Sequence, residues 1–205
     1  MRATEALGVL RGMQRPLIET REAAARLGIS QSRASHLLRS LEQAGLARRM
    51  RRGLWTLQSD LDPFVAPPYL TAPLPAYVSL WSALSHHGMI EQIPRMTHVA
   101  SLARTQRIAT PLGTYSVHHL APEVFTGFSG SDETGYLAVP EKALFDVVYL
   151  RAVAGGPVTL PELELPPGFR GERLDEWTAR VRRPRLRTIV SRGLDAAMAQ
   201  ARRSE

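Results

Sequence analysis

Apolar residues near the start of the chain recur at helical spacing, in two short runs separated by a glycine. The first run predicts a helix that begins after Thr20, whose hydroxyl oxygen suits an N-cap, and that ends at Gly28, which can adopt the left-handed conformation. Its buried face is small and consists of Ala23, Ala24 and Leu27. Glu22 lies in the first turn, where a carboxylate favours the helix dipole.

The second run predicts a helix over residues 31–44, with Ser30 as its cap and Gly45 at its end. Its apolar positions fall at i, i+3, i+4 and i+7 and form one stripe: Ala34, Leu37, Leu38 and Leu41. Two short helices joined by a tight turn predict a helix-turn-helix.

Residues 46–57 change to the alternation of a β-hairpin, which would form a wing beside the two helices. Gly53 permits the turn, and Leu54, Trp55 and Leu57 return towards the core. In front of the helix-turn-helix, residues 2–13 predict an opening helix that packs beneath it. The connection over residues 16–19 could add a strand to the wing.

The rest of the chain alternates between strand and helix periods. Residues 59–76 contain five prolines, which exclude regular helix and predict an extended, semi-rigid connection between two domains. After it we expect a helix over 77–90, a strand at 97–101, a hairpin over 106–120, a glycine-rich loop, a strand at 136–139, a helix from 141 to about 152, and closing helices over 174–183 and 186–203. The sequence therefore predicts an α+β fold: a winged helix-turn-helix domain over residues 1–58, a proline-rich linker over 59–76, and an α+β domain with a small mixed sheet over 77–205.

The positive charge of the chain is concentrated at its N-terminal end. Residues 1–58 contain 11 arginines and 4 acidic residues, a net charge of +7 that equals the net charge of the whole chain. Residues 59–165 carry 5 basic and 10 acidic residues, and residues 166–205 carry 10 and 5. This distribution indicates a polyanionic partner for the first domain.

Polar side chains without a carboxylate occupy the outward side of the second predicted helix, a composition typical of helices that contact base edges and phosphates. They are Gln31, Ser32, Arg33, Ser35, His36 and Arg39. Four arginines crowd the wing: Arg48, Arg49, Arg51 and Arg52. We therefore predict that the helix enters the major groove of double-stranded DNA and that the wing holds phosphates or enters the minor groove. The alternative is a winged helix used for protein contacts, with solvated arginines.

Several protein classes are disfavoured by composition. The absence of cysteine fits a reducing cytoplasm, and no apolar run approaches the twenty or so residues that span a bilayer. The N-terminus is too interrupted by charge for a signal peptide. There is no phosphate-binding glycine loop and no nucleophile elbow. We therefore expect a cytoplasmic protein that is not an enzyme, needs no cofactor and does not bind a membrane.

Three segments of the second domain follow the winged helix in an order that resembles the AbiEi antitoxins of type IV toxin–antitoxin systems. They are YVSLWSALSHHGMIEQIP, TPLGTY and GYLAVPEKALFDVVYL, and the most specific parts are residues 79–88 and 138–146. The resemblance spans nearly the whole chain. It implies that the first domain binds inverted repeats in the promoter of its own operon and represses it, and that the second opposes a co-encoded nucleotidyltransferase toxin and helps to bind DNA. It also implies DNA-recognition roles for the helix residues 31, 32, 33, 36 and 39, and backbone contacts for the wing arginines.

Two histidine pairs, His86–His87 and His118–His119, raise the hypothesis of a metal site. Neighbouring residues point about 100° apart on a helix and to opposite faces of a strand, so such a pair seldom chelates one ion. We therefore expect helix-end and sheet histidines without a metal.

Glu141, Lys142 and Asp146 follow a predicted strand and suggest a magnesium-dependent nuclease. That chemistry needs carboxylates on adjoining strands and a lysine on the same face, whereas here the acid and the lysine are neighbours on a predicted helix. The structural alternative is that Glu141 caps the helix while Lys142 and Asp146 pair at i, i+4 on its surface. Three functions are therefore considered: a DNA-binding antitoxin, which we expect, a regulator whose second domain senses a ligand, and a nuclease targeted by the winged helix.

Overall fold

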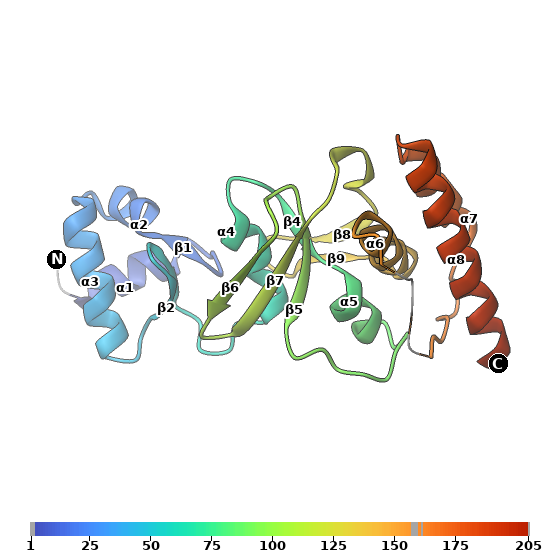
Figure 1. Cartoon of the computed structure of the whole chain (residues 1–205). Coiled ribbons are helices and arrows are strands. Elements are labelled where there is room, and N and C mark those ends of the chain that lie inside the picture. Colours follow the sequence, from blue (N-terminus) through green and yellow to red (C-terminus); the bar gives the residue numbers. More distant parts are fainter. Residues whose placement is uncertain (1–2, 157–159, 161, 205) are drawn as a thin grey trace.

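The chain forms an elongated molecule in the computed structural model, which describes residues 3–156, 160 and 162–204. The winged helix-turn-helix lies at one end, a pair of helices lies at the other, and a six-stranded sheet lies between them (Figure 1). The N-terminal elements are α1 (Ala3–Arg11), β1 (Ile18–Glu19), α2 (Thr20–Leu27), α3 (Gln31–Gln43), β2 (Arg48–Arg51) and β3 (Leu54–Thr56). The remaining elements are η1 (Pro63–Val65), α4 (Pro67–Thr71), β4 (Ala76–Val78), α5 (Leu80–His86), β5 (Thr97–Ser101), β6 (Gln106–Thr110), β7 (Gly113–His119), η2 (Pro122–Val124), β8 (Phe128–Ser131), β9 (Gly135–Ala138), α6 (Pro140–Val153), α7 (Glu172–Arg180) and α8 (Pro184–Ser204).

The helix-turn-helix and its wing are confirmed. Helices α1, α2 and α3 enclose an apolar core: Leu7, Leu10, Ile18, Ala23, Leu38, Leu41 and Trp55. Strand β1 pairs with β3, so the predicted additional strand of the wing is present. The opening helix ends at Arg11, two residues earlier than predicted, and residue 2 of that prediction lies outside the described residues.

The start of α2 differs from the prediction by one residue. Glu19, rather than Thr20, is the N-cap, and its backbone N–H donates to the Glu22 carboxylate at 2.9 Å. Thr20 is the first helical residue, and its side chain faces the wing instead. The carboxylates of Glu19 and Glu22 thus lie at the positive end of the helix dipole, and the Thr20 hydroxyl is available for a tertiary contact.

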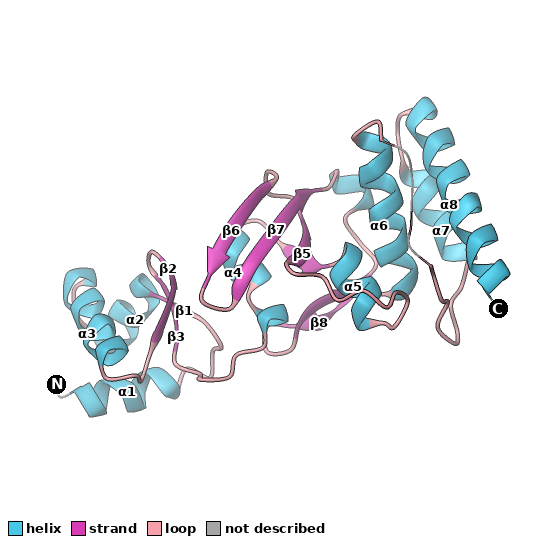
Figure 2. Ribbon diagram, turned by 60° about the horizontal axis from the view of Figure 1, so that its bottom comes forward, coloured by secondary structure: helices cyan, strands magenta, loops and turns pink. Residues whose placement is uncertain are grey.

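The predicted mixed sheet is confirmed and has six strands in the order β6-β7-β5-β4-β9-β8. The pairs β5–β7 and β4–β9 are parallel, and the other three are antiparallel. Helix α4 lies on the side of the sheet that faces the winged helix, whereas α5 and α6 lie on the opposite side (Figures 1 and 2). The α+β class is therefore correct.

Residues 59–76 are not extended throughout, in contrast to the prediction. They contain η1 and α4, and β4 begins at their last residue, Ala76. Helix is possible here because Pro63, Pro67 and Pro68 occupy first-turn positions, where no backbone N–H is needed.

Two further elements of the second half differ from the prediction. Tyr77 and Val78 belong to β4 instead of a helix, because their backbone pairs with β5 on one side and β9 on the other. The predicted glycine-rich loop contains β8, which pairs with β9. The closing helices are confirmed, with α7 and α8 shifted by a few residues from the predicted bounds.

Candidate nucleic-acid interface

Local signals in the turn before α3 fix the position of this helix. Gly28, with φ of +63°, ends α2, and the Ser30 hydroxyl accepts a hydrogen bond from the Arg33 backbone N–H at 3.3 Å. The predicted apolar stripe packs inward, with Ala34, Leu38 and Leu41 buried and Leu37 half-buried. The remaining side of α3 consequently faces solvent.

All six polar residues predicted for the outward side of α3 lie on it. Gln31, Ser32, Arg33, His36 and Arg39 are exposed, and Ser35 is half-buried.

Three of them form one small array, because Nε of Arg39 donates to the Ser35 carbonyl oxygen and its Nη2 lies 3.3 Å from Nδ1 of His36. Arg33 has no side-chain partner in the described part of the chain. The helix therefore presents the Arg39 guanidinium in an orientation fixed by hydrogen bonds, whereas the Arg33 guanidinium can change its orientation.

The four wing arginines differ in their surroundings. Arg48 donates to the carbonyl oxygen of Ser59, and Arg51 donates to that of Tyr69 at 3.1 Å. The guanidinium of Arg49 lies over the Trp55 ring, 5.9 Å from its centroid. Arg52 is exposed in the turn, and its side chain has no hydrogen bond or ion pair among the described residues. Arg49 and Arg52 are thus the wing arginines most available to a phosphate.

Hydrogen bonds hold the wing against the two helices of the motif. The Arg49 backbone N–H donates to the Glu42 carboxylate at the end of α3, at 3.1 Å. The Thr20 backbone N–H donates to Gly53 in the wing turn at 2.8 Å. The wing and α3 therefore present their exposed side chains in a fixed relation.

A cavity of about 320 Å³ joins the start of α3 to the wing turn. Its walls include Gln31 from α3, Arg51 and Arg52 from the wing, and Arg21 from α2, whose guanidinium forms an ion pair with Glu19 in the same wall. Arg21 was not among the predicted site residues. Its position in the first turn of the first motif helix, which crosses the DNA backbone in such proteins, is a signal by which the sequence could have identified it.

The candidate nuclease residues are enclosed in the core. Lys142 and Asp146 pair at i, i+4 as predicted, but both side chains are 0% exposed, so their predicted surface position is wrong. Asp146 also accepts hydrogen bonds from the Tyr77 hydroxyl (3.0 Å) and the Ser79 hydroxyl (2.7 Å). Burial raises the pKa of Asp146 and lowers that of Lys142, while their mutual attraction opposes both shifts. Neither group reaches a surface where a phosphodiester could bind.

Glu141 does not cap α6, in contrast to the prediction. The N-cap is Val139, and Pro140 occupies the first turn. The buried Glu141 carboxylate instead accepts from the Arg170 backbone N–H at 2.8 Å and lies 3.6 Å from the Arg173 guanidinium. It tethers the segment that leads into α7.

One histidine of each sequence pair contacts a backbone carbonyl oxygen, whereas His118 meets a histidine of another strand, a contact that was not predicted from the sequence. A ring nitrogen of His87 lies 2.7 Å from the Ala138 carbonyl oxygen, and one of His119 lies 3.2 Å from that of Leu102. His98 and His118 meet across β5 and β7, with Nδ1 and Nε2 3.3 Å apart. Burial, with the neighbouring His118, lowers the pKa of His98 to about 4. Twenty residues separate the two histidines, so no local pattern reveals the pair.

Two properties of the described residues bear on metal binding and on membranes. No three of their His, Cys, Asp or Glu side chains form a group that could hold a metal ion. None of the helices in residues 3–156 and 162–204 has the length and apolar character needed to cross a membrane.

Comparison with known protein families identifies the N-terminal part. Residues 1–51 match the IclR helix-turn-helix domain, which covers α1, α2, α3 and the first strand of the wing. No curated protein matches the chain. The N-terminal part is therefore an IclR-type helix-turn-helix DNA-binding domain, which supports a transcriptional regulator.

Proposed function

We propose that this protein is a sequence-specific repressor that binds inverted repeats in the promoter of its own operon and acts as the antitoxin of that operon, in the cytoplasm. The observation that carries the DNA-binding half is the outward side of α3. Over residues 31–39 it offers six polar residues and no carboxylate, next to a basic wing held by hydrogen bonds to α2 and α3.

In this proposal α3 enters the major groove and the wing lies against the backbone. Base edges and nearby phosphates are contacted by Gln31, Ser32, Arg33, Ser35, His36 and Arg39. Phosphates are contacted by Arg48, Arg49, Arg51 and Arg52. Arginine and glutamine suit guanine and adenine edges, respectively, in bidentate geometry.

We further propose the division into a DNA-binding domain over residues 1–58, a linker over 59–76 and an antitoxin domain over 77–205. Two of the apolar clusters support it, because one is confined to residues 7–57 and another to residues 77–201. A third cluster contains Leu17, Met50 and Leu54 together with side chains of the six-stranded sheet. The two domains therefore share an apolar contact.

The antitoxin half of the proposal rests on the resemblance to AbiEi proteins, in which the second domain opposes a nucleotidyltransferase toxin. The two segments that carry the resemblance most specifically, residues 79–88 and 138–146, meet in the core, where Ser79 donates to Asp146. This contact indicates that the two segments jointly stabilise the core of the second domain. It assigns no residue to toxin neutralisation, which could be direct or could follow from repression.

DNA binding is tested with the upstream sequence of the protein's own operon. Fluorescence anisotropy should show tighter binding to that sequence than to a scrambled duplex at the same salt concentration, by about 10³-fold or more for a specific operator. Equal affinity for both duplexes would exclude sequence-specific repression.

The antitoxin role is tested by growth rescue. The neighbouring reading frame is expressed alone, with the full-length protein, and with a full-length variant that carries Gln31→Ala, Arg33→Ala and Arg39→Ala. A full-length variant is used instead of a fragment of residues 1–58, because truncation after residue 58 would expose Leu17, Met50 and Leu54. Rescue by both proteins would place neutralisation outside the DNA-binding surface, whereas a harmless neighbour would exclude the antitoxin role.

A further inference from the structure

One large apolar side chain projects almost fully into solvent. Ile93 is 86% exposed, whereas the next most exposed large apolar residue of the described chain, Val153, is 54% exposed. Ile93 belongs to the connection between α5 and β5, which runs along the outside of the molecule (Figure 1). Single exposed apolar residues are common on protein surfaces, so the meaning of this one depends on its surroundings.

The connection that carries Ile93 is held at both ends. Before it, Met89 is buried, and its carbonyl oxygen accepts a hydrogen bond from the Glu164 backbone N–H at 3.0 Å. After it, the His98 backbone N–H donates to the Ser82 hydroxyl of α5 at 2.8 Å. A fixed segment therefore presents Ile93 to solvent.

An apolar cavity of about 380 Å³ lies beside the same segment. Its lining is Trp81, Ile90, Gln92, Pro94, Arg95, Met96 and His98. Gln92 and Pro94 belong to this lining, whereas Ile93 between them does not. One surface thus carries both an exposed isoleucine and an open apolar cavity that this isoleucine does not fill.

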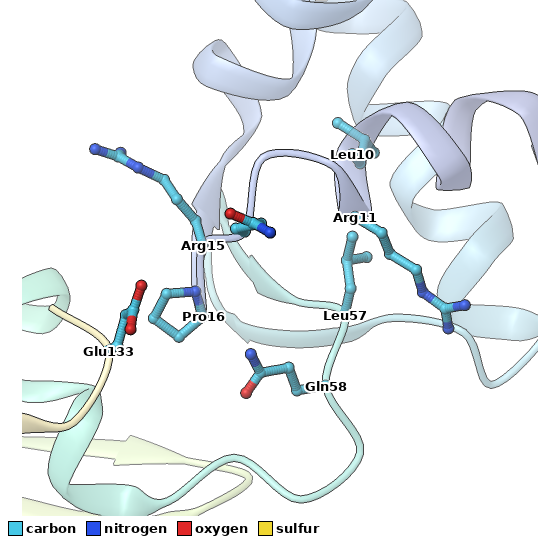
Figure 3. Close-up of a pocket in the computed structure, with 8 residues that line it drawn as sticks. Leu10, Arg11, Arg15, Pro16, Leu57, Gln58 and Glu133 are labelled. Atoms are coloured by element: carbon cyan, nitrogen blue, oxygen red, sulfur yellow. The ribbon is translucent and has the colours of Figure 1, made fainter.

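The cavity beside α5 differs from the larger cavity of about 560 Å³ between the winged helix and the six-stranded sheet, which Figure 3 shows. In the larger cavity Leu10 and Pro16 are buried, whereas Arg11, Arg15 and Glu133 are exposed. The Arg11 guanidinium is directed away from that cavity (Figure 3). The larger cavity therefore offers little apolar surface to a second protein.

Opposite charges flank the exposed isoleucine. Arg95 follows it by two residues and lines the apolar cavity. Glu91 precedes it by two residues and, with Glu162 and Glu164, lines an adjacent cavity of about 260 Å³ that shares Ile90 with the first. The four charged side chains are exposed and have no hydrogen bond or ion pair among the described residues. A twofold axis close to the isoleucine would bring the acidic side of one copy to the arginine of another.

We propose that this surface is the interface of a symmetric homodimer. Ile93 of each subunit enters the cavity beside α5 of the other, and Arg95 of each subunit faces Glu91 of the other. A second copy of the chain fits this surface because projection and cavity, and likewise the two charges, are mutually complementary. An acidic partner would face unpaired carboxylates, and a basic partner would face an unpaired guanidinium.

The twofold symmetry of the dimer matches that of inverted repeats, which place two copies of a binding domain in a twofold relation. This support rests on the proposed repressor function. The exposed isoleucine, the cavity and the flanking charges do not depend on it.

Dimerisation is tested on the full-length protein without DNA, by sedimentation velocity over a range of protein concentrations. The contact involves one short segment of each subunit, so we expect a weak dimer whose sedimentation coefficient increases with concentration. Ile93→Ser should weaken association at least tenfold. Val153→Ser, which removes an exposed apolar side chain from α6, is the control and should leave association unchanged.

The facing charges are tested separately by reversal. Glu91→Arg places two arginines opposite each other, and Arg95→Glu places two carboxylates opposite each other, so each should weaken association about fivefold or more. The double variant restores opposite charges and should associate within about twofold of the unmodified protein. This recovery is expected only where Glu91 of one subunit lies near Arg95 of the other.

The possible outcomes separate the dimer from the repressor function. A chain that stays monomeric at every concentration, as it would if the surface bound a different protein, would overturn the dimer. Association unaffected by Ile93→Ser, or lost equally with Val153→Ser, would overturn the interface, and absence of recovery in the double variant would overturn the pairing of charges. Operator binding by a monomeric protein would leave the repressor function standing, whereas a dimer without operator binding would do the reverse.

Discussion

The indole N–H of Trp55 donates a 3.0 Å hydrogen bond to the hydroxyl of Thr20, joining the second wing strand to the first turn of α2. The same hydroxyl donates to the Gly53 carbonyl oxygen at 3.3 Å. One side chain thus links a strand, a turn and a helix, all of which border the proposed DNA-binding surface.

Thr20→Val should lower the free energy of unfolding by about 1–3 kcal/mol, because the substitution keeps the shape of the side chain but leaves the Trp55 N–H without its acceptor. Urea denaturation measures the loss. Thr188→Val on α8 is the control, since that hydroxyl is exposed and bonds only the preceding turn, and it should change stability by less than about 0.5 kcal/mol. Equal effects at the two positions would contradict the role of Thr20.

Arg33→Ala and Arg39→Ala should each weaken operator binding, by about 1–3 kcal/mol for an arginine that contacts a base edge. Both side chains are exposed, so the fold should be retained. Anisotropy titrations give the affinities, and Arg151→Ala, at an exposed position on α6, is the control. Unchanged operator affinity of the double variant would exclude α3 as the recognition helix.

Replacing all four wing arginines by glutamine should weaken binding to operator and random DNA alike and flatten the salt dependence. Each phosphate contact contributes about 0.9 to the slope of log K against log salt concentration. We expect a larger effect from the pair Arg49 and Arg52 than from Arg48 and Arg51, whose guanidinium groups bond carbonyl oxygens of the chain. A slope unaltered by the fourfold variant would exclude the wing as a phosphate-binding element.

Stability should fall as the pH decreases from about 6.5 to about 4, partly through His98. The pKa of this residue is lowered from 6.5 to about 4 in the folded protein, so the unfolded chain binds the proton first. The stabilisation is fully present above pH 6.5 and is lost as the pH approaches 4. Melting temperatures of the His98→Gln variant should vary less over this interval than those of the unmodified protein. Parallel curves would show that His98 does not contribute.

Single replacements of the buried pair should be strongly destabilising. Lys142→Met leaves the Asp146 carboxylate without its cation, and Asp146→Leu leaves the lysine unpaired, each at a cost of about 3–5 kcal/mol. The double variant should be more stable than either single one, because no uncompensated charge remains in the core. Denaturation of the three variants measures the coupling, and strictly additive losses would contradict it.

The parts of the fold that depend on local signals could be predicted from the sequence. The helix-turn-helix was predicted correctly because its signals each act within a few residues. They are the helical spacing of Ala34, Leu38 and Leu41, the Ser30 cap and the left-handed Gly28. The outward polar residues of α3 follow directly from the same period.

Features that depend on pairing between remote segments could not be predicted in this way. Tyr77 and Val78 have a helical pattern but join a sheet because β5 and β9 supply hydrogen bonds on both sides. The His98–His118 pair depends on the register of two parallel strands. The contact of Arg51 with Tyr69 likewise requires the wing to lie against α4, which no local pattern encodes.

The apolar cluster that joins the wing to the larger sheet limits how freely the DNA-binding unit could be exchanged between proteins. Leu17, Met50 and Leu54 are each no more than 2% exposed, and their neighbours include Val99 and Tyr115 of the sheet. A chimaera that joined the winged helix to an unrelated domain would expose these three apolar side chains and would tend to aggregate, unless the three positions were redesigned. Substitutions in this apolar cluster on the winged-helix side are therefore expected to be accompanied by compensating changes on the sheet side during evolution, and the reverse.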